Sequence, residues 1–143
     1  MTNNINKQGV HISVVIATIG RASLFKTLQS ISQSSIIPSE ILIVIPEKNL
    51  NKIHFINNFD NLNLKKIITK ESNQVVQRIN GFNSCKSPYV LQLDDDVIIE
   101  ENTIEELLNF SLENDNTAVA PRYKNNLKIS KIYRKPDNLL LKF

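Results

Sequence analysis

The sequence is poor in the residues that cross-link or loosen a chain, with one cysteine, three glycines and five prolines among 143 residues. A single cysteine, Cys85, excludes a disulfide within the chain, so nothing in the sequence points to an oxidising compartment. A small buried residue on a helix is the favoured interpretation of Cys85 over a catalytic thiol. The scarcity of glycine and proline argues against a disordered chain.

Long apolar runs are also absent. No stretch reaches the roughly 20 apolar residues that a membrane-spanning helix needs, and the polar residues 1–7 lack the apolar core of a signal peptide. The chain is 41% hydrophobic and 22% charged, which is typical of a soluble globular protein. Its length suits one domain, 1–143. We therefore expect a cytoplasmic protein, at most peripherally associated with the inner face of a membrane.

Two further absences narrow the function. The sequence has neither a Gly-x-Gly-x-x-Gly motif nor a Walker loop, which counts against a dinucleotide enzyme and a phosphate-loop NTPase. Aromatic residues make up only 6% of the chain, and they are not interleaved with basic residues as on RNA-stacking surfaces. No nucleic-acid partner is therefore expected, and the oligomeric state is left open.

Charge is unevenly distributed along the chain. Residues 1–121 carry 10 basic and 13 acidic side chains, whereas residues 122–143 carry seven basic side chains and one acidic. The net charges are thus −3 and +6. A basic segment, 122–143, beside an acidic body suggests contacts with phosphates, an anionic bilayer or a partner. A merely solvated segment is an equally good interpretation.

Apolar runs and turn residues alternate along the chain. Short runs rich in β-branched residues predict strands at 11–19, 40–45, 64–69, 89–93, 117–120 and 127–133. Apolar residues at helical spacing predict four helices. The expected inner faces are Leu24, Leu28 and Ile31 in the first helix, Val75, Ile79 and Phe82 in the third, and Ile104, Leu107, Leu108 and Leu112 in the fourth. The second helix, with Ile53 and Ile56 on one side, is predicted more weakly. Ser72 is the expected cap of the third helix, and Asn102 with Glu105 resembles a capping box for the fourth.

This alternation predicts an α/β fold, a three-layer sandwich with a mostly parallel central sheet and helices on both faces. In such sheets, ligands bind at the carboxyl ends of strands, near the point where the strand order reverses. Loops that begin at Thr18, Pro46 and Asp94 each follow a predicted strand. We expect these three loops to face one crevice.

The acidic triplet Asp94-Asp95-Asp96 is the most informative local feature. It lies between two apolar runs, 89–93 and 97–99, so its three negative charges need compensation. A divalent cation would compensate them most simply, because Mg²⁺ and Mn²⁺ bind carboxylate oxygens and can bind phosphate oxygens at the same time. The alternative is an acidic turn that caps the next segment.

Several stretches resemble a known family. Residues 13–21 (Ser-Val-Val-Ile-Ala-Thr-Ile-Gly-Arg) and 40–44 (Glu-Ile-Leu-Ile-Val) resemble the opening of family 2 glycosyltransferases of the GT-A fold. Residues 77–81 (Gln-Arg-Ile-Asn-Gly) resemble the family's Ala-Arg-Asn-x-Gly helix, and residues 87–96 resemble the strand that leads into its Asp-x-Asp motif. The order and spacing of these motifs over residues 11–121 are more specific than any one of them.

The resemblance implies the N-terminal, nucleotide-sugar-binding part of such an enzyme. Asp96 would ligate Mg²⁺ or Mn²⁺ bridging the donor's diphosphate. Asp94 would be a second ligand lying toward the ribose or sugar, and Asp95 is ambiguous between those roles. Metal and cations would stabilise the departing nucleoside diphosphate, which is the main electrostatic need of sugar transfer.

Four further residues take donor-binding roles from the same resemblance. Thr18 and Arg21 would lie near the nucleoside, and Arg78 would neutralise part of the donor's charge. In the family, aspartates usually end the second strand and hold the donor's nucleobase, and Glu47 would substitute for them here. The family's second half supplies the acceptor site and the carboxylate base for inversion. We expect that half to be missing here, and we assign no catalytic base.

The sequence is compatible with three functions. The first is a metal-dependent glycosyltransferase that moves sugar from a nucleotide-diphosphate donor to a cell-surface glycan or lipid-linked acceptor, with inversion. The second is a truncated or non-catalytic nucleotide-sugar-binding module that needs a partner or a C-terminal half. The third is a nucleotidyltransferase-like protein that uses the carboxylates in a different phosphate reaction.

Overall fold

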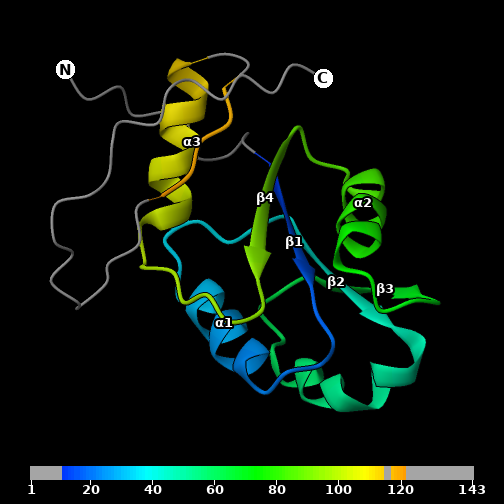
Figure 1. Cartoon of the computed structure of the whole chain (residues 1–143). Helices are drawn as coiled ribbons and strands as arrows, with labels where there is room; N and C mark the ends of the chain where they lie inside the picture. Colours follow the sequence, from blue (N-terminus) through cyan, green and yellow to red (C-terminus); the bar gives the residue numbers. More distant parts are fainter. Residues whose placement is uncertain (1–10, 115–116, 122–143) are drawn as a thin grey trace, which may run out of the picture.

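The computed structural model describes residues 11–114 and 117–121. These residues form a single sheet with helices around it (Figure 1). In chain order the elements are β1 (Ile12–Ala17), α1 (Ser23–Ser32), β2 (Glu40–Pro46), the 3₁₀ helix η1 (Glu47–Asn58), β3 (Leu64–Thr69), α2 (Gln74–Ser84), β4 (Tyr89–Asp94) and α3 (Thr103–Glu113). No helix within the described ranges is long and apolar enough to cross a membrane.

The sheet is parallel throughout, with strand order β3-β2-β1-β4. This confirms the predicted α/β class and parallel sheet. The first three strands run outward in one direction, and β4 then returns to the other side of β1, so the strand order reverses at β1. Ala17 at the end of β1 is opposite Val44 of β2 and Asp94 of β4. The loops after β1 and β4 therefore leave the sheet side by side, at the switch point where ligands bind in such folds.

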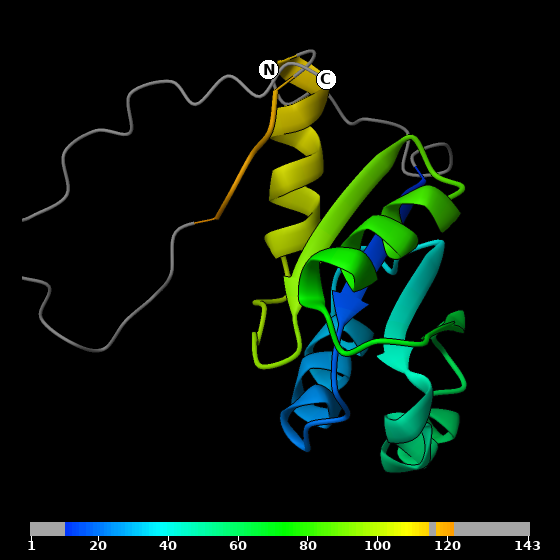
Figure 2. The same ribbon diagram turned by 45° about the vertical axis from the view of Figure 1, so that its right-hand side comes forward.

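Alternation along the strands divides the core into two layers. Side chains such as Ile16 and Ile43 pack with α1, η1 and α3, and this cluster includes Leu28 and Ile104. Val15, Leu42 and Val44 point to the opposite face, where α2 lies. Figure 2 shows α2 on its own side of the sheet. The expected three-layer arrangement is thus confirmed, because a strand buried on both faces needs a helix against each of them.

The prediction of which residues of α2 face the sheet is wrong. Val75, Ile79 and Phe82 have helical spacing, yet they point to solvent and are 63%, 51% and 42% exposed. Gln77 and Gly81 face the sheet instead. Gly81 lets the helix approach closely, because a Cβ at this position would overlap Val15 and lie 3.1 Å from Val44 Cγ2. Backbone proximity and a polar anchor therefore decide the orientation of this helix.

Other boundaries also differ from expectation. Asn73 caps α2 in place of Ser72, since its side chain accepts from the amides of Val75 and Val76 at 3.0 and 3.3 Å. The capping box of α3 does not form, because the side chain of Asn102 caps no amide and Glu105 accepts from the hydroxyl of Ser35.

Three further expectations concern the ends of elements. The weak helix expected over 50–59 is a 3₁₀ helix that begins earlier, at Glu47. Residues 117–120 form no strand. The strand expected at 127–133 and the rest of the basic segment 122–143 lie outside the described residues.

Candidate functional site

The acidic triplet forms a tight turn at the end of β4. The amide of Val97 donates to the carbonyl of Asp94 at 3.3 Å, which places Asp95 and Asp96 at the corner of the turn. The side chains of Asp94 and Asp96 are 45% and 57% exposed, whereas that of Asp95 is only 7% exposed. Asp94 and Asp96 are thus open to a ligand, and Asp95 is held inside the protein.

Thr18 connects the turn to the end of β1. Its hydroxyl donates to Asp95 Oδ2 at 2.5 Å and accepts from the amide of Gly20 at 2.9 Å. Both Thr18 and Asp95 are buried, so this charge-assisted hydrogen bond satisfies a carboxylate that water does not reach. Arg21 follows in the same loop, and its guanidinium lies 3.7 Å from both Asp95 Oδ1 and Asp96 Oδ2.

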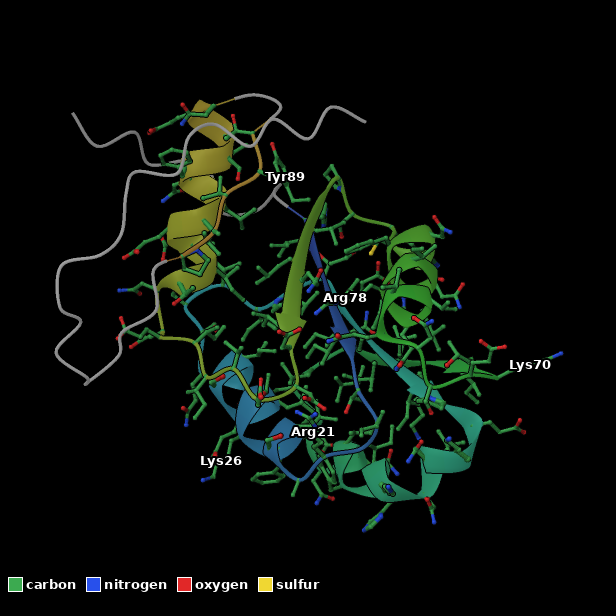
Figure 3. All side chains as sticks on the ribbon, in the orientation of Figure 1. Arg21, Lys26, Lys70, Arg78 and Tyr89 are labelled. Carbon is green, nitrogen blue, oxygen red and sulfur yellow. The ribbon has the colours of Figure 1, made fainter. Side chains whose placement is uncertain are left out.

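Arg78 reaches the triplet from the other side. Its Nη2 donates to Asp94 Oδ1 at 2.7 Å, from a helix that covers the opposite face of the sheet from α1. Figure 3 shows Arg78 between α2 and the end of the strands, and Arg21 on the loop below them. The side-chain amide of Gln92 is satisfied when its oxygen faces Arg78, and in that orientation the oxygen accepts from Nε of Arg78 at 3.0 Å. The arginine is therefore held by two side chains of β4.

Gln77 is a residue of this site that sequence reasoning did not assign. Its amide nitrogen donates to the carbonyl of Thr18 at 2.8 Å and to the carbonyl of Val44 at 2.7 Å. It is buried and ties the ends of β1 and β2 to α2. No local signal distinguished Gln77 from the other polar residues of this helix, and the spacing of Val75, Ile79 and Phe82 indicated a different inner face.

The structure changes the reason for expecting a metal. Thr18 and two arginines compensate the triplet's charge, so the fold does not require a cation at this position. Within the described residues, no three His, Cys, Asp or Glu side chains gather to hold a metal. The half-exposed carboxylates of Asp94 and Asp96 nevertheless offer hard oxygen ligands of the kind that Mg²⁺ binds together with substrate phosphates. The donor set therefore fits a metal that the substrate shares, and not a metal held by protein alone.

The loop after β1 also lies against η1. Gly20 adopts φ +79°, a left-handed conformation that favours glycine, and a Cβ at this position would lie 2.6 Å from Cβ of Lys52 and 3.4 Å from the carbonyl of Asn49. The side-chain oxygen of Asn49 is buried without a hydrogen-bond partner among the described residues. Glu47 is exposed at the start of η1, directly after the carboxyl end of β2. It takes no part in the hydrogen bonds and ion pairs that join Arg21 and Arg78 to the acidic turn.

A second polar network lies at the opposite edge of the sheet. The buried carboxylate of Glu40 accepts from the hydroxyl of Ser13, from Nζ of Lys65 and from the amide of Lys86, each at 2.7 Å. Burial raises the pKa of Glu40, but these hydrogen bonds outweigh it and lower the pKa from 4.5 to about 2. The network fastens the loop before β4 to β1 and β2.

Cys85 lies beside this network at the end of α2. Its thiol donates to the carbonyl of Gly81 at 3.3 Å. Burial raises the pKa of Cys85, and the charge of Glu40 adds to that rise. The thiol is therefore kept protonated, which suits a structural residue and not a nucleophile.

The parallel sheet, its switch point and the acidic turn define a nucleotide-diphospho-sugar transferase type of α/β domain, similar to GT-A glycosyltransferase structures. A family model described as "Glycosyl transferase family 2" matches residues 13–142. The chain therefore belongs to glycosyl transferase family 2, and it is a glycosyltransferase-like protein. This confirms the resemblance found in the sequence.

Solved structures share the fold at low sequence identity. S. aureus TarS superposes with a TM-score of 0.59 at 19% identity, over 73% of this chain and 20% of that chain. A TarS 1-349 structure in complex with UDP-GlcNAc gives 0.57 at 18% identity, over 73% of this chain and 32% of that one. The 4-diphosphocytidyl-2C-methyl-D-erythritol synthase of Anaerococcus prevotii gives 0.59 at 19% identity, over 76% of this chain and 53% of that one. The chain thus spans one fifth to about one half of these proteins. No curated protein matches it at a significant level.

Proposed function

We propose that this chain binds a nucleotide-diphosphate sugar and serves a metal-dependent glycosyltransferase, which transfers the sugar with inversion to a cell-surface glycan or lipid-linked acceptor. The observation that carries the proposal is the cluster of Arg21, Arg78 and the acidic turn at the switch point of a family 2 domain. Carboxylates and guanidinium groups side by side suit a ligand that is itself a metal–diphosphate complex. The TarS complexes with UDP-GlcNAc and with UDP support a donor of this chemical class.

Each residue of the cluster takes a defined role in this proposal. Asp94 and Asp96 hold Mg²⁺ or Mn²⁺, because their carboxylates are the exposed ones. Arg78 and Arg21 exchange their carboxylate partners in part for phosphate oxygens, which accept from guanidinium groups with similar geometry. Asp95 and Thr18 position the turn. When bound, the metal supplies positive charge to the departing diphosphate.

Two further assignments complete the proposal. Glu47 lies directly after the carboxyl end of β2, and we assign it to binding the nucleobase of the donor. The enzyme is assigned to the cytoplasm, at the inner face of the membrane, where nucleotide sugars and lipid-linked acceptors meet. No residue of this chain is assigned to deprotonate the acceptor, so the chemistry proposed here is donor binding and stabilisation of the leaving group.

Calorimetric titration with UDP, with and without Mn²⁺, tests donor binding. We expect binding that depends on the metal, and Asp96→Asn should weaken it by at least about tenfold because one of two carboxylate ligands is lost. Asp60→Asn is the matched control, since Asp60 is an exposed aspartate away from the turn. Equal affinities for the two variants, or no UDP binding under either condition, would contradict the proposal.

The role of Arg78 needs its own comparison. Arg78→Met removes a charge-assisted hydrogen-bond donor worth roughly 1.5–3 kcal/mol, which corresponds to about 10- to 100-fold in UDP affinity. Lys66→Met removes an exposed cation from β3 and should leave UDP affinity unchanged. Release of UDP from a nucleotide sugar, abolished by Asp96→Ala, would distinguish an active transferase from a binding module that holds the donor without transferring it.

A further inference from the structure

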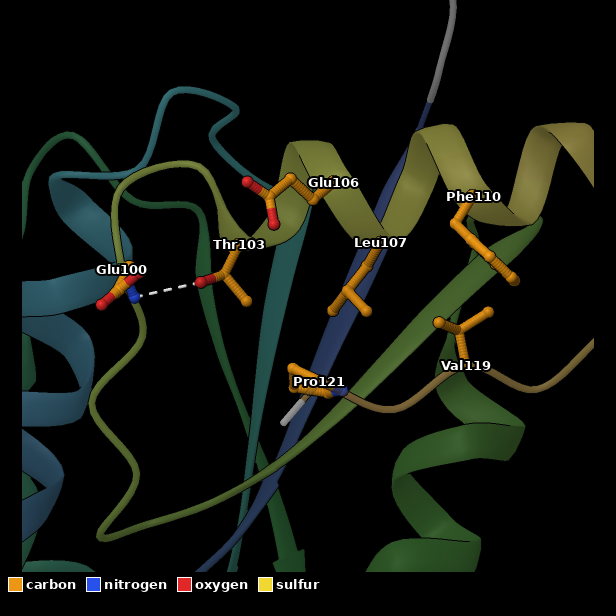
Figure 4. Close-up of a pocket in the computed structure, with 7 residues that line it drawn as sticks. All are labelled: Glu100, Thr103, Glu106, Leu107, Phe110, Val119 and Pro121. Atoms are coloured by element: carbon orange, nitrogen blue, oxygen red, sulfur yellow. Dashed lines mark hydrogen bonds between the residues drawn. The ribbon is translucent and has the colours of Figure 1, made fainter. Parts of the chain in front are cut away.

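A groove runs between α3 and the segment that follows it, and its lining includes no residue of the acidic turn. Its volume is about 410 Å³, and Figure 4 shows its lining, with α3 along one side and residues 119–121 along the other. Two carboxylates, Glu100 and Glu106, lie at one end. The walls are apolar, made by Leu107, Phe110, Val119 and Pro121. None of the predicted donor-site residues takes part.

The groove belongs to a strongly acidic part of the chain. Residues 100–113 contain five glutamates and no lysine or arginine. Glu106 is exposed, and the residue Phe110 is 49% exposed. An apolar wall with a carboxylate rim suits a ligand that is both apolar and basic.

The chain itself provides such a ligand next to the groove. Pro121 lines the groove, and the basic segment 122–143 begins at the following residue. That segment carries seven basic side chains and one acidic, and its stretch 127–133 combines two lysines with Leu127, Ile129, Ile132 and Tyr133. Because the segment is covalently joined to Pro121, its contact with the groove would be intramolecular, so even a weak intrinsic affinity would populate the contact.

We infer that the basic segment 122–143 docks in cis on the acidic groove of α3, with the apolar side chains of 127–133 against Leu107 and Phe110 and its cations beside Glu106. The inference rests on charge complementarity, on the apolar lining and on the tether at Pro121. It is independent of donor binding. Docking would cover the apolar wall of the groove and neutralise the most acidic helix of the domain.

Paramagnetic relaxation enhancement in the full chain tests the inference. A nitroxide is attached to Ser130→Cys in a ¹⁵N-labelled Cys85→Ser background, and amide intensities are compared with those of the reduced label. We expect the amides of residues 106–110 to lose at least twice as large a fraction of intensity as those of α2. Salt at 0.5 M should reduce this loss, because surface ion pairs are screened. Equal effects on α2 and α3, or none on α3, would overturn the inference.

Two controls separate docking from other causes. Glu106→Gln should reduce the intensity loss at α3, whereas Glu71→Gln, which removes an exposed glutamate before α2, should leave it unchanged; equal effects would overturn the inference. A mixture of spin-labelled ¹⁴N chain and unlabelled ¹⁵N chain reports on contacts between copies. Intensity loss in the mixture equal to that in the labelled chain would identify a second copy as the occupant and would also overturn docking in cis.

Discussion

The hydroxyl of Thr18 donates to the buried carboxylate of Asp95 at 2.5 Å, across 77 positions of sequence. This bond joins the loops that leave the neighbouring strands β1 and β4, and it fixes the acidic turn relative to the end of β1. It therefore determines the directions in which Asp94 and Asp96 point, although Asp95 itself is withdrawn from solvent.

Thr18→Val should destabilise the protein by about 2 kcal/mol, because it leaves a buried carboxylate oxygen without its nearest donor while preserving side-chain shape. Urea unfolding at pH 7 measures this change. Thr27→Val is the matched control, since Thr27 is also buried but its hydroxyl makes only a 3.5 Å contact with the carbonyl of Ser23. The control should change stability by less than about 1 kcal/mol. Similar losses for both variants would show that the bond to Asp95 contributes little.

Gln77→Leu should cost roughly 2 kcal/mol, because the carbonyls of Thr18 and Val44 then lose a buried donor. Gln77→Glu should cost more at neutral pH, since a carboxylate would face two carbonyl oxygens. Acidification should recover part of this loss by protonating the carboxylate. Gln74→Leu, at an exposed position of the same helix, is the control. Unfolding curves from pH 7 to pH 5 test the order of these stabilities, and a Gln77→Glu variant as stable as Gln77→Leu would contradict it.

The network around Glu40 predicts acid sensitivity of a defined sign. The folded-state pKa of about 2 lies below the unfolded value of 4.5, so the unfolded chain binds the proton first as pH falls. The contribution of Glu40, on the order of 3 kcal/mol, is complete above pH 4.5 and is lost progressively between pH 4.5 and about 2.

Glu40→Gln isolates this contribution. At pH 7 the variant should be less stable than the unmodified chain by about 3 kcal/mol, and the difference should shrink as pH falls below 4.5. Glu71→Gln, at an exposed site, should show little difference at any pH. A gap between Glu40→Gln and the unmodified chain that stays constant down to pH 2.5 would contradict a depressed pKa.

Gly81→Val should destabilise the fold by about 2–3 kcal/mol, because the added atoms overlap Val15 and approach Val44 under α2. Asn83→Val places the same side chain at an exposed position of the same helix, where valine and asparagine have similar helix propensities. Thermal unfolding of the two variants measures the difference. If both melt at the same temperature, α2 can move away from the sheet without cost.

Much of the candidate site was predictable from the sequence because its residues lie next to strand ends. Thr18, Arg21 and the aspartates were recognised by position, and the structure brings them together with Arg78. The partners of each aspartate were not predictable, since Thr18 and Asp95 meet only through the order β2-β1-β4 and its register. Gln77 was missed because a buried glutamine is recognisable only once its two backbone acceptors are placed.

The sequence by itself determined the alternation of strands and helices, the parallel α/β class and the position of three carboxylates after a strand. These properties follow from local periodicity and from turn residues. Only the tertiary structure decided that α2 presents Gln77 and Gly81 to the sheet, that Glu40 is the centre of a buried network, and that arginines compensate the acidic turn. Those outcomes depend on contacts between distant residues, where close backbone approach and the satisfaction of buried polar groups outweigh local hydrophobic spacing.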